Sequence, residues 1–386
     1  MKTYPPSLPR VVGAWSDDFF RTHCFDLWRE HLNWLAAEGF APALQTETDV
    51  IVPAPSGHEM VDLLGEFIAH TGLINAHLGL TSSDVCDNVR LMQLACACGH
   101  VTAGVIQLII ELPQVLCELL PSGLRTETVG FTHWQPAAPI TWGHRVLAWT
   151  GPLRYAAEHP PRLHAKQFGG PVGNGASLQR VLKCDALALT ERLDHFQWDE
   201  FGLNQPANPC PLQSSDHVDE LAAVQWLARI AAQLHKLAAD WRFLASLDVI
   251  KMSDPARIGS SSMPHKANPH HWEKVCGLCR SAATVQQELW DVAAHNSLER
   301  TLDTSWQIKH ALPRACRCVA EAVDLLRAHL PRVRLFADAD LLAKWTPLID
   351  SDQQLTAEVL NGKSRWTAFL EATRQITPTT KSPAQL

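Results

Sequence analysis

The sequence lacks an excess of positive charge, an N-terminal leader and a continuous apolar span. Its formal net charge is -7, which gives no electrostatic basis for binding nucleic acid or an anionic membrane. Residues 1–21 contain no charged-then-apolar leader, and no uncharged apolar window reaches the roughly 18 residues of a membrane span. With 46% hydrophobic and 19% charged residues, the sequence predicts a soluble globular protein of the cytoplasm.

A disulfide framework and a zinc-finger pattern are also missing. The 11 cysteines are odd in number, and those in apolar helical stretches are expected to be buried, reduced thiols: Cys96, Cys98, Cys117, Cys316 and Cys318. Cys276 and Cys279 form one CxxC near His270 and His271, without a second CxxC at zinc-finger spacing. We interpret this CxxC as one packed helix face, with a zinc or redox site as the alternative.

Alternation with a period of two is absent, so a sizeable sheet is not expected, whereas helical spacing recurs throughout. Residues 85–120 predict one helix of roughly 54 Å at about 1.5 Å per residue, with Pro113 as a candidate kink. Apolar residues from Leu221 to Leu244 step by threes and fours, which is typical of a bundle seam. Further helices are predicted at residues 15–38, from 58, and at 141–159, 272–296 and 309–330.

These patterns predict an all-α protein built on a long helix bundle. We divide it into an N-terminal helical domain (1–83), a central long-helix bundle domain (84–330) and a short C-terminal region (331–386). A glycine-rich stretch at 170–175 does not follow a predicted strand, so we interpret it as a loop where the backbone passes close to another element, rather than as a dinucleotide site.

Three polar turns interrupt the helices, at residues 81–84, 132–135 and 259–269. The third combines Gly259 and three serines with prolines that disfavour helix, so it predicts a mobile loop. Lys266 and Asn268 add a cation and an amide suited to holding a carboxylate. An ordinary interhelical turn is the alternative interpretation from composition alone.

The third turn, read as GSSSMPHKANP, resembles the signature GSSxMPxKxNP of the fumarase/aspartase superfamily at every fixed position. The resemblance covers about residues 15–330. The run HLGLTSSDVCDN, His265 within the signature and the run ERTLD before Ser305 make the sequence most similar to the adenylosuccinate lyase branch.

This resemblance implies a fold with a twenty-helix core in a homotetramer, and active sites each built from three subunits. It implies β-elimination of an N-succinyl substrate with release of fumarate, without a metal or an organic cofactor. The expected reaction is adenylosuccinate to AMP or a related nucleotide, as in purine biosynthesis. The expected partners are therefore a small-molecule substrate and further copies of the chain.

Carried over by resemblance, Ser260 is the general base, and Lys266 or nearby N–H groups would stabilise its alkoxide. His133 is the matching general acid, because imidazole titrates near neutral pH. His58 corresponds to a second family histidine that orients His133 or contacts substrate, and a plain helix-start histidine is the alternative. His77 is expected to line the site or to pack.

The remaining expected contacts fall on both halves of the substrate. Residues expected to bind the succinyl half or touch the substrate are Thr81, Ser82, Thr132, Gln213, Ser261, Met263 and Asn268. Those that align with residues around a nucleotide phosphate or its neighbouring carboxylate are Arg300, Ser305 and Lys309.

The sequence departs from that branch in the second half. It has no clear counterpart of the family's N-terminal Arg-Tyr, Gly57 precedes the histidine where a basic residue is common, and Lys309 replaces an arginine. Trp306 follows Ser305 where small residues are usual, and the C-terminal region is short. A lyase acting on a different, non-nucleotide succinyl or aspartyl adduct is therefore the main alternative. A non-catalytic helical scaffold is the other, which the presence of Ser260, His133 and Lys266 disfavours.

Overall fold

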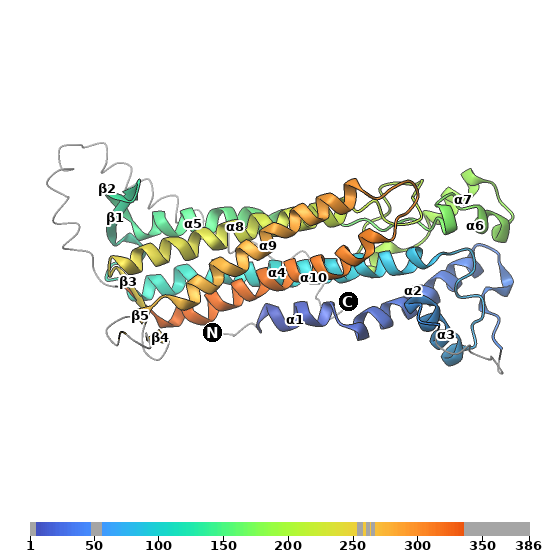
Figure 1. Ribbon diagram of the computed structural model, residues 1–386, viewed down its shortest axis with the longest axis horizontal. Coiled ribbons are helices and arrows are strands. Elements are labelled where there is room, and N and C mark those ends of the chain that lie inside the picture. Colours follow the sequence, from blue (N-terminus) through green and yellow to red (C-terminus); the bar gives the residue numbers. More distant parts are fainter. Residues whose placement is uncertain (1–4, 48–55, 253–257, 260–262, 264–266, 336–386) are drawn as a thin grey trace.

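The chain forms an elongated bundle of long helices, as the sequence predicts (Figure 1). The computed structural model describes residues 5–47, 56–252, 258–259, 263 and 267–335. Within these residues, α9 packs against both α8 and α10, and α4 packs against α10 and α5. The long helices are α2 (Asp17–Ala37), α4 (Ser82–Leu119), α5 (Trp142–Glu158), α8 (Val218–Ser246), α9 (His270–Ala294) and α10 (Asp303–His329).

The predicted seam along α8 is the centre of the core. Leu227, Leu234, Leu237 and Trp241 are all fully buried. Burying one such large apolar side chain contributes about 1.5–3 kcal/mol, so the seam favours packing over an isolated helix. The sequence pattern therefore determines which face of α8 turns inward.

Helix α4 is apolar and long enough to cross a membrane by length and composition alone, contrary to the expectation from the sequence that no window would qualify. Its packing identifies it as a core helix, because α1 (Ser7–Ala14), α2, α5 and α10 all contact it. Its 38 residues span about 57 Å at the usual rise per residue. Pro113 lies inside the helix and does not end it.

The two ends of this rod carry different structures (Figure 1). The strands lie near the C-terminus of α4, and we call this end of the rod the hairpin end. Near its N-terminus lie α6 (Ala176–Leu182) and α7 (Ala186–Leu193), which define the α6–α7 end, together with α3 (Glu59–Thr71). Short 3₁₀ turns connect these elements: η1 (Ala41–Leu44), η2 (Gly123–Arg125), η3 (Gly170–Val172), η4 (Trp198–Phe201) and η5 (Leu330–Arg332).

The strands form three two-stranded ribbons in the described residues, so the prediction of no sizeable sheet is confirmed. β1 (Glu127–Thr132) pairs with β2 (Gln135–Thr141), β3 (Ile250–Met252) with β6 (Val333–Leu335), and β4 (Ile258–Gly259) with β5 (Ala267–Asn268). The first ribbon is a finding beyond the sequence prediction, which treated residues 132–135 only as a polar turn.

Several helix boundaries differ from the prediction. Helix α10 begins at Asp303 rather than near Lys309, and the sequence analysis did not anticipate α1, α6 or α7. Trp306 explains the late predicted start, because this large apolar residue in the first turns of α10 is 71% exposed and breaks the apolar period.

The 11 cysteines are all free, in agreement with the absence of a disulfide framework. Cys276 and Cys279 are both buried on α9, which supports the packed-face interpretation of the CxxC. Cys117, which was expected to be buried, is exposed, because it lies in the last turn of α4 where the neighbouring Glu118 also faces solvent.

Candidate active site

The structure places the predicted site residues in separate regions rather than in one cluster. Thr132 and His133 lie at the hairpin end, and β4 and β5 bring the signature segment to the same end (Figure 1). Thr81 and Ser82 lie at the α6–α7 end, where α4 begins. The length of α4, about 57 Å, separates the two groups.

His133 occupies the tip of the β1–β2 hairpin. The last strand pair joins Thr132 and Gln135, which leaves His133 and Trp134 as a two-residue loop. Both have positive φ, 51° and 64°, as a type I′ turn requires. Asn-Gly is the usual choice there, and holding other residues in this conformation costs on the order of 1–2 kcal/mol each. An exposed histidine is thus held at the tip against the local backbone preference.

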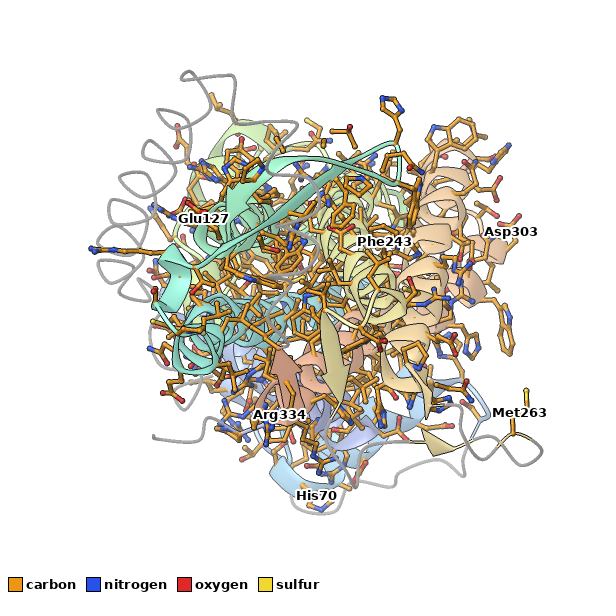
Figure 2. The ribbon with its side chains drawn as sticks, turned by 90° about the vertical axis from the view of Figure 1, so that its left-hand side faces the viewer. His70, Glu127, Phe243, Met263, Asp303 and Arg334 are labelled. Atoms are coloured by element: carbon orange, nitrogen blue, oxygen red, sulfur yellow. The ribbon has the colours of Figure 1, made fainter. Side chains whose placement is uncertain are left out.

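Aromatic contacts fix the hairpin on the bundle. Phe243 of α8 meets Phe131 edge-on, with ring centroids 5.1 Å apart, and meets Trp134 in the same way at 4.6 Å. Figure 2 shows Phe243 beside the hairpin strands at the near end of the rod. Trp134 is nevertheless 70% exposed, so the turn reaches beyond the bundle and directs His133 toward solvent.

The signature segment is residues 259–269, of which the structure describes Gly259, Met263 and residues 267–269. Gly259 and Ala267 face each other in the β4–β5 pair. Asn268 is half-buried, and Met263 is 41% exposed and projects from the edge of the bundle (Figure 2). Ser260, Ser261 and Lys266 lie outside the described residues, so their predicted roles remain predictions.

A fully buried carboxylate, Asp84, organises the α6–α7 end. Asp84 accepts hydrogen bonds from the N–H groups of Thr81 (2.9 Å), Gly169 (3.1 Å) and Gly170 (2.9 Å). It also forms an ion pair with the buried ammonium of Lys166. Removing one member of such a buried pair costs about 3–5 kcal/mol, because the other charge is left unpaired. The pair therefore fixes the turn at Thr81 to the loop that follows Lys166.

The glycines of that loop are required by the close approach. Gly170 has φ +68°, and a Cβ there would lie 3.1 Å from the carbonyl oxygen of Gly79. A Cβ on Gly169 would meet the backbone of Gly173 at 2.7 Å. Residues 170–175 are thus a loop passing close to another element, which confirms that interpretation of the sequence.

Arg300 joins three segments at this end. Its Nη1 donates to Ser83 Oγ at 2.9 Å and to Gln213 Oε1 at 3.0 Å. Gln213 in turn donates from Nε2 to the Pro171 carbonyl at 2.5 Å, and its backbone N–H donates to the Glu299 carbonyl at 3.0 Å. The predicted residues Gln213 and Arg300 are therefore in direct contact, and together they hold the start of α4.

The other predicted residues of this end flank that cluster. His58 is the exposed residue before α3, and the next residue, Glu59, pairs with Lys309 at 2.6 Å. Ser305 lies one turn before Lys309 on α10, half-buried. Within one chain His58 lies at the opposite end from His133 (Figure 1), so it cannot orient that imidazole unless a second chain brings the two together.

Helix α2 contacts the segment just before the turn at residues 81–84. Trp28 donates from Nε1 to Nδ1 of His77 at 3.2 Å, and the rings meet edge-on. Burial lowers the pKa of His77, so this imidazole is neutral and packs as the sequence analysis allowed. His31 is fully buried, and its Nε2 donates to the Leu78 carbonyl at 3.0 Å. Burial lowers the pKa of His31 to about 4.

His31 is expected to make the fold sensitive to acid. The neutral imidazole is favoured in the folded state, so its contribution is complete above the unfolded pKa of 6.5 and is lost as the pH falls toward about 4. The pKa difference corresponds to roughly 3 kcal/mol of unfolding free energy. His31→Gln keeps an N–H donor for Leu78 and should remove about this much of the pH dependence, measured by urea unfolding at neutral and acidic pH. If the free energy of unfolding changed by the same amount between the two pH values in wild type and His31→Gln, the assignment would be contradicted.

A cavity of about 150 Å³ lies next to the cluster around Arg300. Lys166, Ser214 and Asp219 line it, and none of the predicted site residues that the structure describes does. His164 also lines it and shares a hydrogen bond with Asp219, Nδ1 to Oδ2, at 3.0 Å. In the described part of the chain, no group of three or more histidine, cysteine or acidic side chains could hold a metal ion.

Four residues that shape the site were not selected from the sequence. Ser83 lies in the predicted turn, but only the structure shows that its hydroxyl accepts a hydrogen bond from Arg300. Lys166 and Glu59 meet partners 82 and 250 residues away, which no local pattern reveals. His31 is one of many polar residues in α2, and nothing in the sequence marks it as a buried one. The motif TSSD could have pointed to Ser83, whereas no sequence signal marked Lys166, Glu59 or His31.

The family model described as lyase matches residues 51–283, which is more than half of the chain. That match covers the first turn, the hairpin and the signature segment. The chain therefore belongs to this lyase family, within the fumarase/aspartase superfamily. Within the superfamily it is adenylosuccinate lyase-like.

The curated relatives agree with this placement. The adenylosuccinate lyase of Schizosaccharomyces pombe is 32% identical over 255 residues, 64% of this chain and 51% of the relative. That of Pyrococcus abyssi is 27% identical over 276 residues, 68% of this chain and 56% of the relative. The chain thus spans about half the length of the curated relatives it matches.

Two solved structures share the fold at low identity. A fumarate lyase from Mesorhizobium sp. BNC1 superposes with a TM-score of 0.62 at 20% identity, covering 87% of this chain and 78% of that one. A 3-carboxy-cis,cis-muconate lactonizing enzyme from Pseudomonas putida gives 0.64 at 21% identity, covering 98% and 88%. The all-α bundle expected from the sequence is confirmed by these likenesses.

Proposed function

We propose that the protein is a lyase that cleaves the C–N bond of an N-succinyl amine and releases fumarate, with adenylosuccinate as the reference substrate. Membership of the lyase family and similarity to adenylosuccinate lyases support the reaction class. The observation that carries the proposal is the contact of Arg300 with Ser83 and Gln213. It fixes a cation and several polar groups at the start of α4, where a carboxylate can be bound.

The reaction has two proton transfers. A base removes a proton from the carbon next to a carboxylate, the electron pair forms the double bond of fumarate, and the C–N bond breaks as an acid protonates the departing nitrogen. We assign Ser260 as the base and His133 as the acid. The exposed position of His133 at a strained hairpin tip supports this role, because strain of this kind persists at functional sites.

Carboxylate binding is assigned to the donors of the three turns. The carbanion formed by the base is delocalised into the neighbouring carboxylate, so cations and N–H or O–H donors around it lower the barrier. We assign this work to Thr81, Ser82, Thr132, Lys266 and Asn268. Ser261 and Met263, which belong to the same signature segment, are assigned to substrate binding.

A complete site requires more than one chain. His133 lies at one end of a helix of about 57 Å, and Thr81 begins the other end. A single copy cannot bring both to one substrate, so we propose a homotetramer in which each active site is shared between subunits. The division into domains at residues 83 and 330, a cytoplasmic location and independence of metal or organic cofactors are parts of the same proposal.

Fumarate release tests the proposed function. The purified protein is expected to produce fumarate from adenylosuccinate or from another N-succinyl amine, followed by ultraviolet absorbance with AMP measured as the co-product. Because elimination gives one fumarate for each amine released, equal amounts of the two products identify C–N cleavage. Absence of fumarate from every succinyl amine tested would leave the non-catalytic scaffold as the surviving alternative.

A second candidate is the same elimination on a non-nucleotide adduct. The pairing of Lys309 with Glu59 favours it, because the ammonium group is already balanced by a carboxylate. The two candidates share every residue of the fumarate half and differ only in the amine that leaves.

A further inference from the structure

His217 is a buried histidine with an unusual backbone conformation at the start of α8. Only 4% of the residue is exposed, and it directly precedes the helix with φ at 63°. Nδ1 of its imidazole lies 3.1 Å from Oε1 of Glu220, which is 3% exposed. A residue other than glycine keeps a positive φ where its contacts outweigh the strain. The contact with Glu220 therefore helps to hold His217 in this position.

The charged groups that act on this imidazole are carboxylates. They are Glu220 on α8, Asp87 on α4 and Asp216 in the preceding loop. Burial lowers the pKa of His217, but the attraction of these carboxylates and the hydrogen bond to Glu220 outweigh burial, so the pKa is raised. Arg90 lies 3.7 Å from Asp87 and balances one of the two buried carboxylates. Among these groups, the other carboxylate is balanced only by a protonated imidazole.

Ser215 connects this buried pair to α4 and to the link between α9 and α10. Its hydroxyl oxygen accepts a hydrogen bond from the His217 N–H at 3.1 Å and lies 3.4 Å from Oε2 of Glu220. Its N–H donates to Oδ2 of Asp87 at 3.0 Å, and its carbonyl accepts from Nδ2 of Asn296 at 2.9 Å. The position of Ser215 thus depends on the charged pair at the start of α8.

The same stretch of chain carries Gln213, which contacts the guanidinium of Arg300. The N–H groups of Gln213 and Ser214 both lie within reach of the Glu299 carbonyl, at 3.0 and 3.4 Å. The side chain of Gln213 accepts from Nη1 of Arg300 at 3.0 Å. Hydrogen bonds in such a network polarise and order one another, so a change of charge at His217 is transmitted to Arg300.

We propose that His217, as the imidazolium ion paired with Glu220, is a positioning residue for the carboxylate-binding guanidinium of Arg300. This inference rests on the proposed lyase function and adds to it a dependence of substrate binding on the charge of one buried group. Loss of the proton leaves Glu220 unbalanced in the interior. Residues 213–215 then lose order, and Arg300 binds the substrate carboxylate more weakly.

The test is the ratio of KM for adenylosuccinate between His217→Gln and wild type, measured by fumarate release at two pH values. Glutamine keeps an N–H donor but carries no charge. A histidine with a raised pKa is charged below its ordinary value of 6.5 and loses its charge as the pH rises through the raised value. The ratio is therefore expected to be about ten at about pH 6, a usual coupling between two sites, and to approach unity at about pH 9. The kcat should stay within about twofold, because only binding is affected.

His217→Lys is the variant that keeps a cation throughout this pH range. Lys183 shows that lysine is accepted at positive φ in this chain, at 51°. The ratio of KM between His217→Gln and His217→Lys should therefore be about ten at both pH values. Thermal unfolding checks that each variant is folded. If His217→Gln does not fold, Glu220→Gln replaces it, and its KM ratio to wild type should also change about tenfold between the two pH values.

The matched control is His195→Gln, which alters another pair of histidine and carboxylate at the α6–α7 end. His195 follows α7, and its Nδ1 lies 2.8 Å from Oε1 of Glu38, but its side chain is 68% exposed. Its KM ratio to wild type is expected to stay near unity at both pH values, because exposed pairs contribute little.

A KM ratio for His217→Gln that is the same at both pH values would overturn the inference, because a purely structural role does not follow the charge of the imidazole. A folded His217→Lys with the KM of His217→Gln would also overturn it. In both cases fumarate release by the wild type would still uphold the lyase. If the wild type released no fumarate from any succinyl amine, the proposed function itself would be contradicted.

Discussion

Replacing His133 by asparagine is expected to lower kcat by about 10²–10⁴-fold, the usual contribution of a positioned general acid. Asparagine suits this test because it adopts positive φ more readily than most residues, and φ at this position is 51°. The hairpin should therefore stay folded, or become slightly more stable, while the titratable group is lost. Steady-state kinetics and thermal unfolding of the same preparation measure the two effects.

The matched control for this substitution is His159→Asn. His159 is an exposed histidine at the end of α5, and its Nδ1 contacts the Tyr155 carbonyl at 2.8 Å. Its replacement is expected to leave kcat within twofold of the wild type. If His133→Asn retained full activity, His133 would not be the acid, although the reaction class could still hold. Ser260→Ala tests the base in the same way.

Mixing two inactive variants is expected to restore activity. His133→Asn damages the hairpin end, whereas Arg300→Met removes the guanidinium that binds Ser83 and Gln213 at the other end. If each site takes these residues from different chains, random assembly of equal amounts leaves about one site in four intact. The mixture should then reach about a quarter of the wild-type kcat after joint refolding or co-expression.

Each variant refolded alone is the control for that experiment, and it should stay inactive. A mixture no more active than the two variants separately would show that one chain supplies both residues, against the distance along α4. Sedimentation of the mixture distinguishes that result from a failure of the variants to assemble.

The sequence predicted the long helices because their apolar spacing is regular. The seam of α8 and the span of α4 follow from it. The β1–β2 hairpin was not predicted, because β2 contains Pro136 and Pro139. Proline cannot donate a backbone hydrogen bond, so its presence argues against a strand. A two-stranded ribbon tolerates them, since each strand has a free edge.

The candidate site was predictable only where residues carry a family motif. Arg300 and Gln213 were selected in this way, and the structure brings them into contact. The pairing of Lys309 with Glu59 was not predictable, because 250 residues separate them and neither belongs to a local pattern. Long-range ion pairs depend on how the helices pack, which one sequence does not specify.

The buried carboxylate of Asp84 also has a consequence for how the protein is made. Its donors Lys166, Gly169 and Gly170 follow it by 82 to 86 residues. During synthesis α4 can form early, but its first turn keeps an unpaired charge until this later segment emerges and docks. The nascent N-terminal half is therefore expected to hold the turn at Thr81 in water, with only the local hydrogen bond from the Thr81 N–H to Asp84. The turn gains its buried ion pair with Lys166 and the hydrogen bonds from Gly169 and Gly170 only after the chain has passed Gly170.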